Sequence, residues 1–414
     1  MIGTFLLIPE YLRLGAWDLI KNWTGELNGG IKSKLALQLV NESALCVNGL
    51  REKRTLNHRG FEVMNGLSFL ATDNEIHKLL DAHTMQEAKN LQINLARIRN
   101  SQGHYKGRIW AFDPHRISTY SKRVMPQKKS KPSAKPKKIL QTFFSLDAET
   151  GQPFGFTISS SGITVTKASR ELLRMMDSSL PPIRSLLVAD SEHENAQFID
   201  YINQSRRYDI IMPVARYKKK MRIIKGLNYT RHSAGYATAE TGYKYRGQTK
   251  EVRLIGQRWG EKKNDYTYKP FIATGDELCL ELLTKKFPKR WKIEEFFNFE
   301  GRMAWDRAST MNLNIRYGKM SLALIAQAAC YQLKKKLPKP YKTWTAEHLS
   351  SSIFRSIDSD LRVKNDTIIA TLYNVPESLG LQKIYGNSSD KLKSEGINPK
   401  IPWLYEFKLD FKFK

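Results

Sequence analysis

Two short, mostly apolar runs that each end in an aspartate constrain the fold of this chain most strongly. They are Arg108-Ile-Trp-Ala-Phe-Asp113 and Ile183-Arg-Ser-Leu-Leu-Val-Ala-Asp190. Runs of this length and composition are typical of strands buried on both faces of a sheet. A carboxylate at the end of such a strand is costly to desolvate unless a cation holds it. Asp113 and Asp190 are therefore the first candidate functional residues.

The segments between and after these runs predict an α/β fold. A turn-rich link, residues 147–152, separates two apolar and aromatic strands of a hairpin. A helix follows the hairpin, and a helix and a strand follow Asp190. The expected hairpin strands, helices and final strand are 139–146, 154–159, 166–177, 194–203 and 209–215. This order mixes antiparallel and parallel pairing in one α/β sheet.

The charge balance of the chain favours a polyanionic partner. Lys and Arg number 68 against 40 Asp and Glu, which gives a formal net charge of +28. Such a surplus attracts DNA or RNA, whereas adhesion without chemistry and a membrane surface are the alternatives. The longest apolar stretch, 321–333, has about 13 residues and is too short to span a bilayer.

Cysteine usage and the N-terminal residues indicate a cellular compartment. The three cysteines are widely spaced, which argues against a disulfide framework and fits a reducing cytoplasm. The N-terminal residues lack the basic region of a signal peptide. We therefore expect a cytoplasmic protein that associates with the nucleoid through DNA.

Two basic segments are candidates for contact with nucleic acid. Residues 114–138, with Lys128 and Lys129 among several lysines and four prolines, suit a solvated linker, a loop that follows phosphates, or both. Residues 216–270 hold 15 Lys and Arg against four acids (15 − 4 = +11), seven tyrosines and Trp259. We expect a β-rich insertion there, because cations bind phosphate while rings stack on unpaired bases. Trp259 is either a packing residue or a side chain that holds a flipped base.

A third carboxylate, Glu294, lies in the aromatic and basic stretch 287–303. In a helix, Arg290 and Glu294 share one face with Phe297 and Gly301. The pair is either a surface ion pair of little energetic value or part of a site. Two aspartates and a glutamate supply the oxygen ligands that a pair of Mg²⁺ ions needs for in-line phosphoryl transfer.

These residues resemble the DDE transposases of insertion sequences, in particular those with a β-rich insertion between the second aspartate and the glutamate. Their signature is Tyr-x2-Arg-x3-Glu-x6-Lys. Phe287, Arg290 and Glu294 match its spacing, with phenylalanine in place of tyrosine. Gly301 stands at the position of the lysine, and Arg302 follows one place later.

The resemblance implies an RNase H-like core: a mixed five-stranded sheet with helices on both sides. It implies that Asp113, Asp190 and Glu294 bind two Mg²⁺ ions, for which Mn²⁺ substitutes, and that Arg290 and Arg302 contact DNA near the cut. The implied reaction is endonucleolytic hydrolysis at the transposon end, followed by attack of the freed 3′-OH on target DNA. The implied partners are terminal repeats, target DNA and a second copy of the chain in a homodimer.

We therefore expect five regions along the chain. A mostly helical region suited to binding DNA ends precedes the first part of the core, the insertion, the last part of the core and a C-terminal region for dimerisation or docking. Their boundaries are 1–107, 108–215, 216–270, 271–337 and 338–414. Within the N-terminal region, apolar residues recur at helical spacing over Asn74–Arg99, and Asp73 or Asn74 is the expected cap. The alternatives are a domesticated or inactive relative that only binds DNA, and a basic structural nucleic-acid-binding protein.

Overall fold

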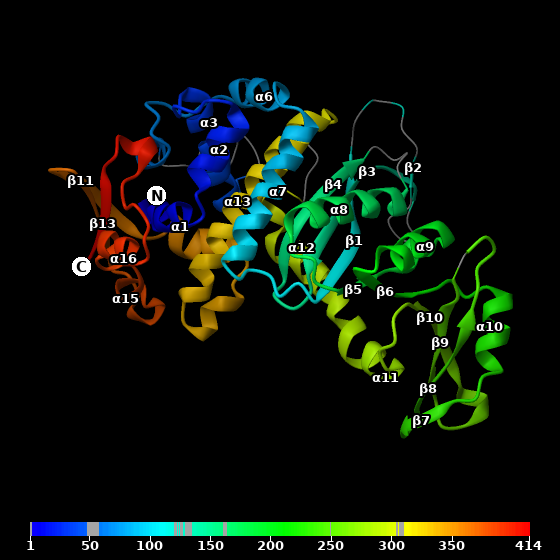
Figure 1. Cartoon of the computed structure of the whole chain (residues 1–414). Coiled ribbons are helices and arrows are strands. Elements are labelled where there is room, and N and C mark those ends of the chain that lie inside the picture. The colour runs from blue at the N-terminus through cyan, green and yellow to red at the C-terminus, as the bar shows by residue number, and fades with distance from the viewer. Residues whose placement is uncertain are drawn as a thin grey trace. The chain divides into compact units, whose positions relative to one another are not determined.

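The computed structural model describes residues 2–47, 58–119, 122, 124, 127–128, 135–159, 164–248, 250–303, 305 and 310–414. The chain divides into two units (Figure 1). Unit 1 comprises 1–99, 118–122 and 297–414, and unit 2 comprises 100–117 and 123–296. Helix α12 (Trp291–Glu300) crosses the boundary, so that its residues 291–296 belong to unit 2.

Unit 2 is built on a large mixed sheet. Ten strands of its described residues hydrogen-bond in the order β2-β3-β1-β5-β6-β10-β9-β8-β7, with β4 paired to β3. The strands are β1 (Ile109–Ser118), β2 (Gln127–Lys128), β3 (Lys137–Asp147), β4 (Gln152–Ser159), β5 (Ser185–Ala189), β6 (Tyr208–Pro213), β7 (Thr230–Ser233), β8 (Tyr236–Tyr243), β9 (Val252–Trp259) and β10 (Thr267–Ala273).

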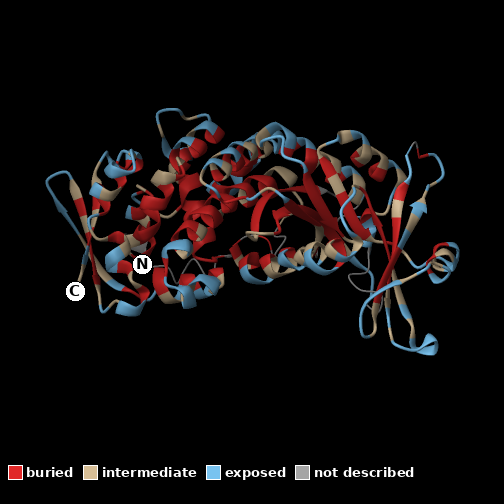
Figure 2. Cartoon of the chain, turned by 60° about the horizontal axis from the view of Figure 1, so that its bottom comes forward, coloured by how far each residue is buried: buried red, intermediate tan, exposed pale blue. Residues whose placement is uncertain are grey.

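The expected five-stranded core is the β4-β3-β1-β5-β6 part of this sheet. Strands β3 and β4 form the antiparallel hairpin, whereas β1 pairs with β5, and β5 with β6, in parallel. Every residue of β5 is buried, as its apolar sequence predicts. Buried residues of the chain are red in Figure 2. The expected mixed α/β fold is thereby confirmed.

The strands of the insertion continue the same sheet. Strand β10 pairs antiparallel with β6, and β9, β8 and β7 follow in antiparallel order. The sheet is therefore larger than the five strands expected from the sequence. In a five-stranded sheet, one edge of β6 would be unpaired. The main chain of β10 pairs with this edge and satisfies its hydrogen-bonding groups.

Helices cover both faces of the core sheet, as two neighbouring residues of β3 show. The Ser145 hydroxyl contacts Met176 of α8 (Val165–Ser179) at 3.4 Å. The ring of Phe144 lies 5.7 Å from that of Phe296 in α12. Successive side chains of a strand point to opposite faces, so α8 and α12 lie on opposite sides. Helix α9 (Ala196–Ser205) leads into β6, and α10 (Lys218–Lys225) and α11 (Cys279–Glu281) belong to the later part of unit 2.

Strand β1 is longer than the sequence indicates. We expected it to end at Asp113, but it continues through Pro114 to Ser118. Its register with β5 does end near the aspartate, at Phe112 opposite Ala189. Because β1 also pairs with β3 on its other side, its extended conformation persists beyond the end of β5.

Unit 1 is mainly helical and is organised around one long buried helix. Helix α13 (Leu313–Lys336) is buried along most of its length and packs against α3 and α6. The other main helices are α1 (Ile8–Arg13), α2 (Ala16–Thr24), α3 (Ile31–Ala44), α5 (His58–Met64), α6 (Asp73–Asp81), α7 (Met85–Ser101), α14 (Ala346–Leu349), α15 (Leu381–Tyr385) and α16 (Ser388–Ser394). Across the described residues, no helix is both long and apolar enough to cross a membrane.

The single amphipathic pattern over Asn74–Arg99 belongs to two helices, which corrects the sequence-based expectation. Thr84 begins the second one: its hydroxyl accepts a hydrogen bond from the Glu87 amide, and the Glu87 carboxylate accepts one from the Thr84 amide. This capping box ends one helix and starts the next without changing the apolar periodicity. The first helix is likewise capped by Thr72, not by Asp73 or Asn74.

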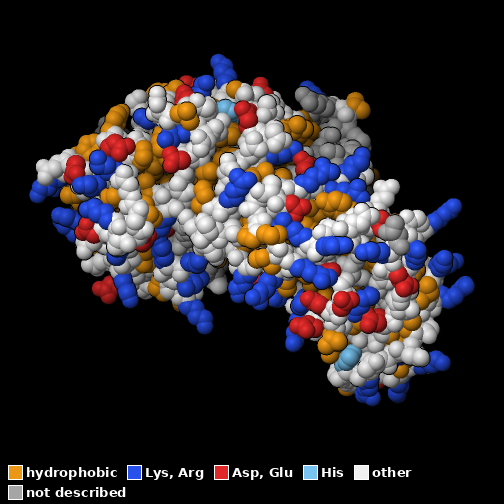
Figure 3. Space-filling model, in the orientation of Figure 1, with side chains coloured by type: hydrophobic (Ala, Val, Ile, Leu, Met, Phe, Trp, Pro, Cys, Tyr) orange, Lys and Arg blue, Asp and Glu red, His pale blue; other side chains and the backbone are white. Residues whose placement is uncertain are grey.

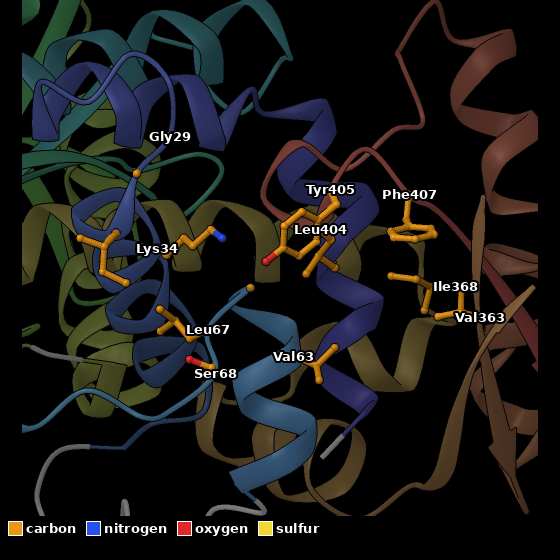
Figure 4. Close-up of a pocket in the computed structure, with 13 residues that line it drawn as sticks. Gly29, Lys34, Val63, Leu67, Ser68, Val363, Ile368, Leu404, Tyr405 and Phe407 are labelled. Atoms are coloured by element: carbon orange, nitrogen blue, oxygen red, sulfur yellow. The ribbon is translucent and has the colours of Figure 1, made fainter. Parts of the chain in front are cut away.

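The C-terminal part of unit 1 contains a three-stranded sheet, β11 (Asp358–Lys364), β12 (Thr367–Tyr373) and β13 (Lys408–Phe413). The last strand, β13, pairs in parallel with β12. An apolar pocket of about 530 Å³ lies beside this sheet (Figure 4). Its lining includes Lys34, Val63, Leu67 and Tyr405.

Candidate active site

Asp113 and Asp190 are neighbours because of strand register. Phe112 of β1 is opposite Ala189 of β5 in a parallel pair. Asp113 follows Phe112, and Asp190 follows Ala189 at the end of β5. Adjacent strands are about 4.8 Å apart, so both carboxylates belong to one small region. The sheet topology thus brings together two residues that are far apart in the sequence.

Arg290 connects Asp113 to Glu294. Its Nη1 donates to Asp113 Oδ1 at 3.3 Å, and its Nη2 donates to Glu294 Oε1 at 2.7 Å. Arg290 ends the 3₁₀ turn η5 (Phe287–Arg290), and Glu294 lies in the first turn of α12. The side chains of Arg290 and Asp113 are 17% and 18% exposed. The Arg290–Glu294 pair is therefore part of a half-buried cluster and not an isolated surface ion pair.

Electrostatic repulsion within this cluster acts on Asp113. Burial, and then the nearby Asp190 carboxylate, raise the pKa of Asp113 to about 7, although the Arg290 guanidinium acts in the opposite direction. Glu294 and Glu192 add further repulsion. The region has a surplus of negative charge that one arginine does not neutralise, and such a surplus favours binding of an additional cation.

Asp190 is held in a different way, by the residues that follow it. It caps the short 3₁₀ helix η2 (Ser191–His193), and its Oδ1 accepts a hydrogen bond from the Glu192 amide at 3.0 Å. His193 Nδ1 lies 2.8 Å from the same oxygen, while its Nε2 lies 3.0 Å from Ser169 Oγ on α8. Burial alone would raise the pKa of Asp190, but the interaction with His193 and the Glu192 amide lowers it overall.

The donor set of this cluster fits a hard divalent cation. Carboxylate oxygens are the ligands that Mg²⁺ prefers, and the repulsion on Asp113 is what such an ion would relieve. In the part of the chain that the structure describes, no three His, Cys, Asp or Glu side chains are close enough to hold a metal ion as they stand. Arg290 instead bridges Asp113 and Glu294. Binding of a metal by all three carboxylates therefore requires Arg290 to release at least one of them.

The other residues predicted for DNA contact belong to other elements or lie outside the described residues. Arg302 belongs to unit 1, in η6 (Gly301–Met303), where it pairs with Glu347. Trp259 is the last residue of β9, is 37% exposed and has a tilted ring contact with Tyr236. Lys128 belongs to β2, and Lys129 lies outside the described residues. Their roles at DNA remain predictions.

Phe287 occupies the position of the signature tyrosine. Its ring packs edge-on against Phe271 of β10, with centroids 5.0 Å apart. The Lys269 ammonium lies over both rings, 5.1 Å from Phe271 and 5.6 Å from Phe287. The side chain therefore contributes apolar packing and a cation–π contact, where a tyrosine would also offer a hydroxyl.

Sequence reasoning missed the residues that support Asp190. Glu192 pairs with Arg116 of β1, and His193 is buried against Ser169. A signal for them exists, because two ionisable residues follow the strand-end aspartate within three positions. The sequence did not indicate that His193 turns inward onto α8, which depends on tertiary packing.

Comparison with known proteins identifies the family. Residues 104–328, more than half of the chain, match the family described as Transposase DDE domain. The chain belongs to this family. Asp113, Asp190, Arg290 and Glu294 all lie within the matched span, and members of this family generally use divalent metal ions. A search of curated proteins gave no match.

One similar solved structure is a piggyBac transposase synaptic complex with hairpin DNA. It shares 11% sequence identity with this chain, and the TM-score is 0.46. The alignment covers 84% of this chain and 80% of that one.

Proposed function

We propose that this transposase cuts DNA at transposon ends and joins the freed 3′-OH to target DNA, using Asp113, Asp190 and Glu294 with divalent metal ions. The observation that carries the proposal is the juxtaposition of the two aspartates by strand register, with Glu294 tied to Asp113 through Arg290. This cluster lies within the span that matches the Transposase DDE domain family.

The three carboxylates would hold two Mg²⁺ ions, which supply Lewis-acid activation and charge neutralisation at a scissile phosphate. The chain's own residues prepare the site. His193 and the Glu192 amide fix the orientation of Asp190, because they occupy Oδ1 and leave the other oxygen for a ligand. Arg290 keeps Asp113 and Glu294 together in the absence of metal and, once released, is placed to bind a DNA phosphate beside them.

The surface charge suits a long polyanionic substrate. Lys and Arg side chains are spread widely over the face shown in Figure 3. In the insertion, the Arg258 guanidinium stacks 4.1 Å from the Tyr266 ring and 4.6 Å from the Tyr229 ring. Trp259, the residue after Arg258, is partly exposed. We propose that the insertion binds phosphates through its cations and stacks on unpaired bases through its rings.

The deciding experiment measures nicking of DNA that carries the element's terminal repeat, with Mg²⁺, for wild type and Asp190→Ala. We expect wild type to nick at the repeat end. The nicking rate of the variant should be lower by at least about a hundredfold, because loss of a residue that only supports a metal ligand already costs about 10–100-fold. Equal nicking by both would refute the metal assignment. Mn²⁺ in place of Mg²⁺ tests the substitution of metals.

The same experiment distinguishes the alternatives. Salt-sensitive binding to DNA without cleavage by the wild type would favour a relative that only binds nucleic acid. The proposed origin in an insertion sequence predicts short inverted repeats on both sides of the gene. The proposed homodimer predicts that light scattering of the complex with paired ends gives two chains for two DNA ends.

A further inference from the structure

The loop that carries Asp190 is fastened to the insertion by a buried charged cluster. Glu194 belongs to this loop, defined here as residues 190–196, and its side chain is 9% exposed. Its Oε1 accepts hydrogen bonds from the Lys220 ammonium and, at 3.0 Å, from the Tyr245 hydroxyl. Its Oε2 accepts one from the Ala215 amide at 2.8 Å. Both oxygens of Glu194 are thus engaged from outside the loop.

Lys220 is buried among aromatic rings. It is 5% exposed, and its ammonium lies 4.8 Å from the centroid of Tyr245, 5.6 Å from Tyr217 and 5.8 Å from Tyr243. Burial lowers the pKa of Lys220 to about 8, so the side chain is still mostly charged at pH 7 opposite Glu194. A lysine with this burial and these partners is a fixed anchor and not a solvated cation.

A second contact joins the same two segments. Gln248, which follows β8 in the insertion, donates from Nε2 to the Ala196 carbonyl at 3.2 Å, at the start of α9. Its Oε1 accepts a hydrogen bond from the Tyr245 amide at 3.2 Å. The loop is therefore tied at two successive places, Glu194 and Ala196, to residues of the insertion.

The opposite end of the loop holds the catalytic carboxylate. His193, next to Glu194, contacts Asp190 at 2.8 Å and Ser169 on α8 at 3.0 Å. The loop thus joins the catalytic site to the insertion: His193 fixes it to α8, and Glu194 and Ala196 fix it to the insertion. Helix α10, which supplies Lys220 from its buried face, exposes Lys218, Lys219, Arg222 and Lys225 on the other.

We infer that Lys220, Glu194 and Tyr245 are positioning residues that hold the Asp190 loop in its catalytic conformation through the insertion. The insertion then has a role besides binding DNA: it supports the loop from which one catalytic aspartate projects. Its effect on cleavage rests on the proposed function, whereas its effect on the loop does not.

The first test is hydrogen–deuterium exchange of the full chain, without metal or DNA. Lys220→Met leaves Glu194 buried without its cation. We expect exchange within 190–196 to become about tenfold faster or more, while β5 and β3 keep wild-type rates. Tyr245→Phe removes one hydrogen bond and should give a smaller increase at the same residues. Unchanged exchange in the loop, or an increase spread equally over the sheet, would overturn the inference.

The second test separates positioning from general stability. In Lys220→Met/Glu194→Gln both charges are gone, and such paired replacements are often neutral for folding. We expect a melting temperature near that of wild type, but loop exchange that stays fast. Cleavage at saturating DNA should fall about tenfold, with the DNA concentration for half-maximal rate unchanged. If the double variant regains wild-type exchange, the cluster is only a structural ion pair.

A matched control exists in unit 1. Lys336 Nζ contacts both carboxylate oxygens of the fully buried Glu10, at 2.6 and 2.7 Å. Lys336→Met/Glu10→Gln removes the same charges from a pair whose carboxylate is fully buried and whose lysine side chain is 31% exposed. It should leave exchange at 190–196 and the cleavage rate unchanged. A wild-type chain that cleaves no DNA would defeat the proposed function, while the exchange measurement would still decide the role of the cluster.

Discussion

Asp113 and Asp190 are adjacent, yet their substitution by asparagine should change stability in opposite directions. Asp113 has its pKa raised to about 7 from an ordinary value of 3.8, chiefly by burial and by Asp190. Asp190 has its pKa lowered, by His193 and the Glu192 amide acting against burial. The two variants are isosteric, so a difference in sign reports the electrostatics of the cluster.

The magnitude for Asp113 follows from linkage. A folded-state pKa above the unfolded value means that the ionised carboxylate destabilises the fold, fully above pH 7 and not at all below about pH 4. The interval from 3.8 to about 7, at about 1.4 kcal/mol per pH unit, corresponds to about 4 kcal/mol. The pKa of about 7 already includes the attraction of Arg290, and the amide oxygen of asparagine can still accept the hydrogen bond from Arg290. Asp113→Asn should therefore stabilise the metal-free protein by up to about 4 kcal/mol at pH 8.

For Asp190 the sign is reversed. A lowered folded-state pKa contributes stability that is present above the unfolded value and is lost as pH falls through the folded value. Asp190→Asn should therefore destabilise the metal-free protein at pH 8 and should match wild type in strong acid.

The assay is urea unfolding in EDTA between pH 4 and pH 8, followed by tryptophan fluorescence. Trp110 reports unit 2 directly, because it is fully buried in β1. Asp113→Asn should approach wild type as the pH falls from 7 to 4, and saturating Mg²⁺ should remove its advantage by relieving the repulsion in wild type. An Asp113→Asn variant that is no more stable than wild type at pH 8, or whose difference does not depend on pH, would refute the reasoning.

Three further predictions concern other parts of the chain. Gly66→Ala should destabilise unit 1 by more than about 2 kcal/mol in urea unfolding, because Gly66 has φ +64° and the added carbon would lie 2.3 Å from the Trp403 carbonyl oxygen. The control is Gly25→Ala, at φ +72° in open space, which should cost only about 1 kcal/mol. Burial raises the pKa of all three thiols, and Glu240 helps to raise that of Cys279 to about 12. A thiol reagent at pH 8 should therefore react with the native protein at least about 100-fold more slowly than with the unfolded chain, and Glu240→Gln should speed labelling of Cys279. DNA affinity, measured by fluorescence anisotropy, should fall steeply as the salt concentration rises. The slope of log affinity against log salt concentration should decrease by about one for each phosphate-contacting lysine removed, and a flat salt dependence would contradict the proposed phosphate contacts.

The sequence was sufficient to predict the positions of the core strands and of the two aspartates that end their apolar runs. Buried parallel strands appear as continuous apolar runs, and for this reason β5 and the start of β1 were predicted at nearly their observed positions. The hairpin β3–β4 was also predicted, since its turn residues are explicit. These features depend on local patterns that tertiary packing does not override.

The elements that the sequence did not predict depend on contacts between distant segments. The two successive helices on either side of Thr84 continue the same apolar periodicity. The sequence pattern therefore did not predict that one helix ends and another begins there, which the capping hydrogen bonds of Thr84 and Glu87 show. The insertion was expected to be β-rich, but its attachment to the edge of β6 depends on backbone pairing that carries no side-chain signal. The contact of His193 with Ser169 joins residues that are 24 positions apart.

The four-residue spacing of Arg290 and Glu294 shows how a short pattern gains meaning from its surroundings. On an isolated helix it predicts an ion pair worth a few tenths of a kcal/mol (about 0.2–0.5). In the folded chain the same guanidinium also reaches Asp113, which lies beside Asp190 because β1 and β5 are parallel and in register. Arg290 thus neutralises part of a carboxylate cluster that would otherwise repel itself, and a metal ion would compete with it for the same oxygens. We therefore expect replacement of Arg290 by methionine to raise the pKa of Asp113 further and to weaken DNA cleavage, even though no metal ligand is removed.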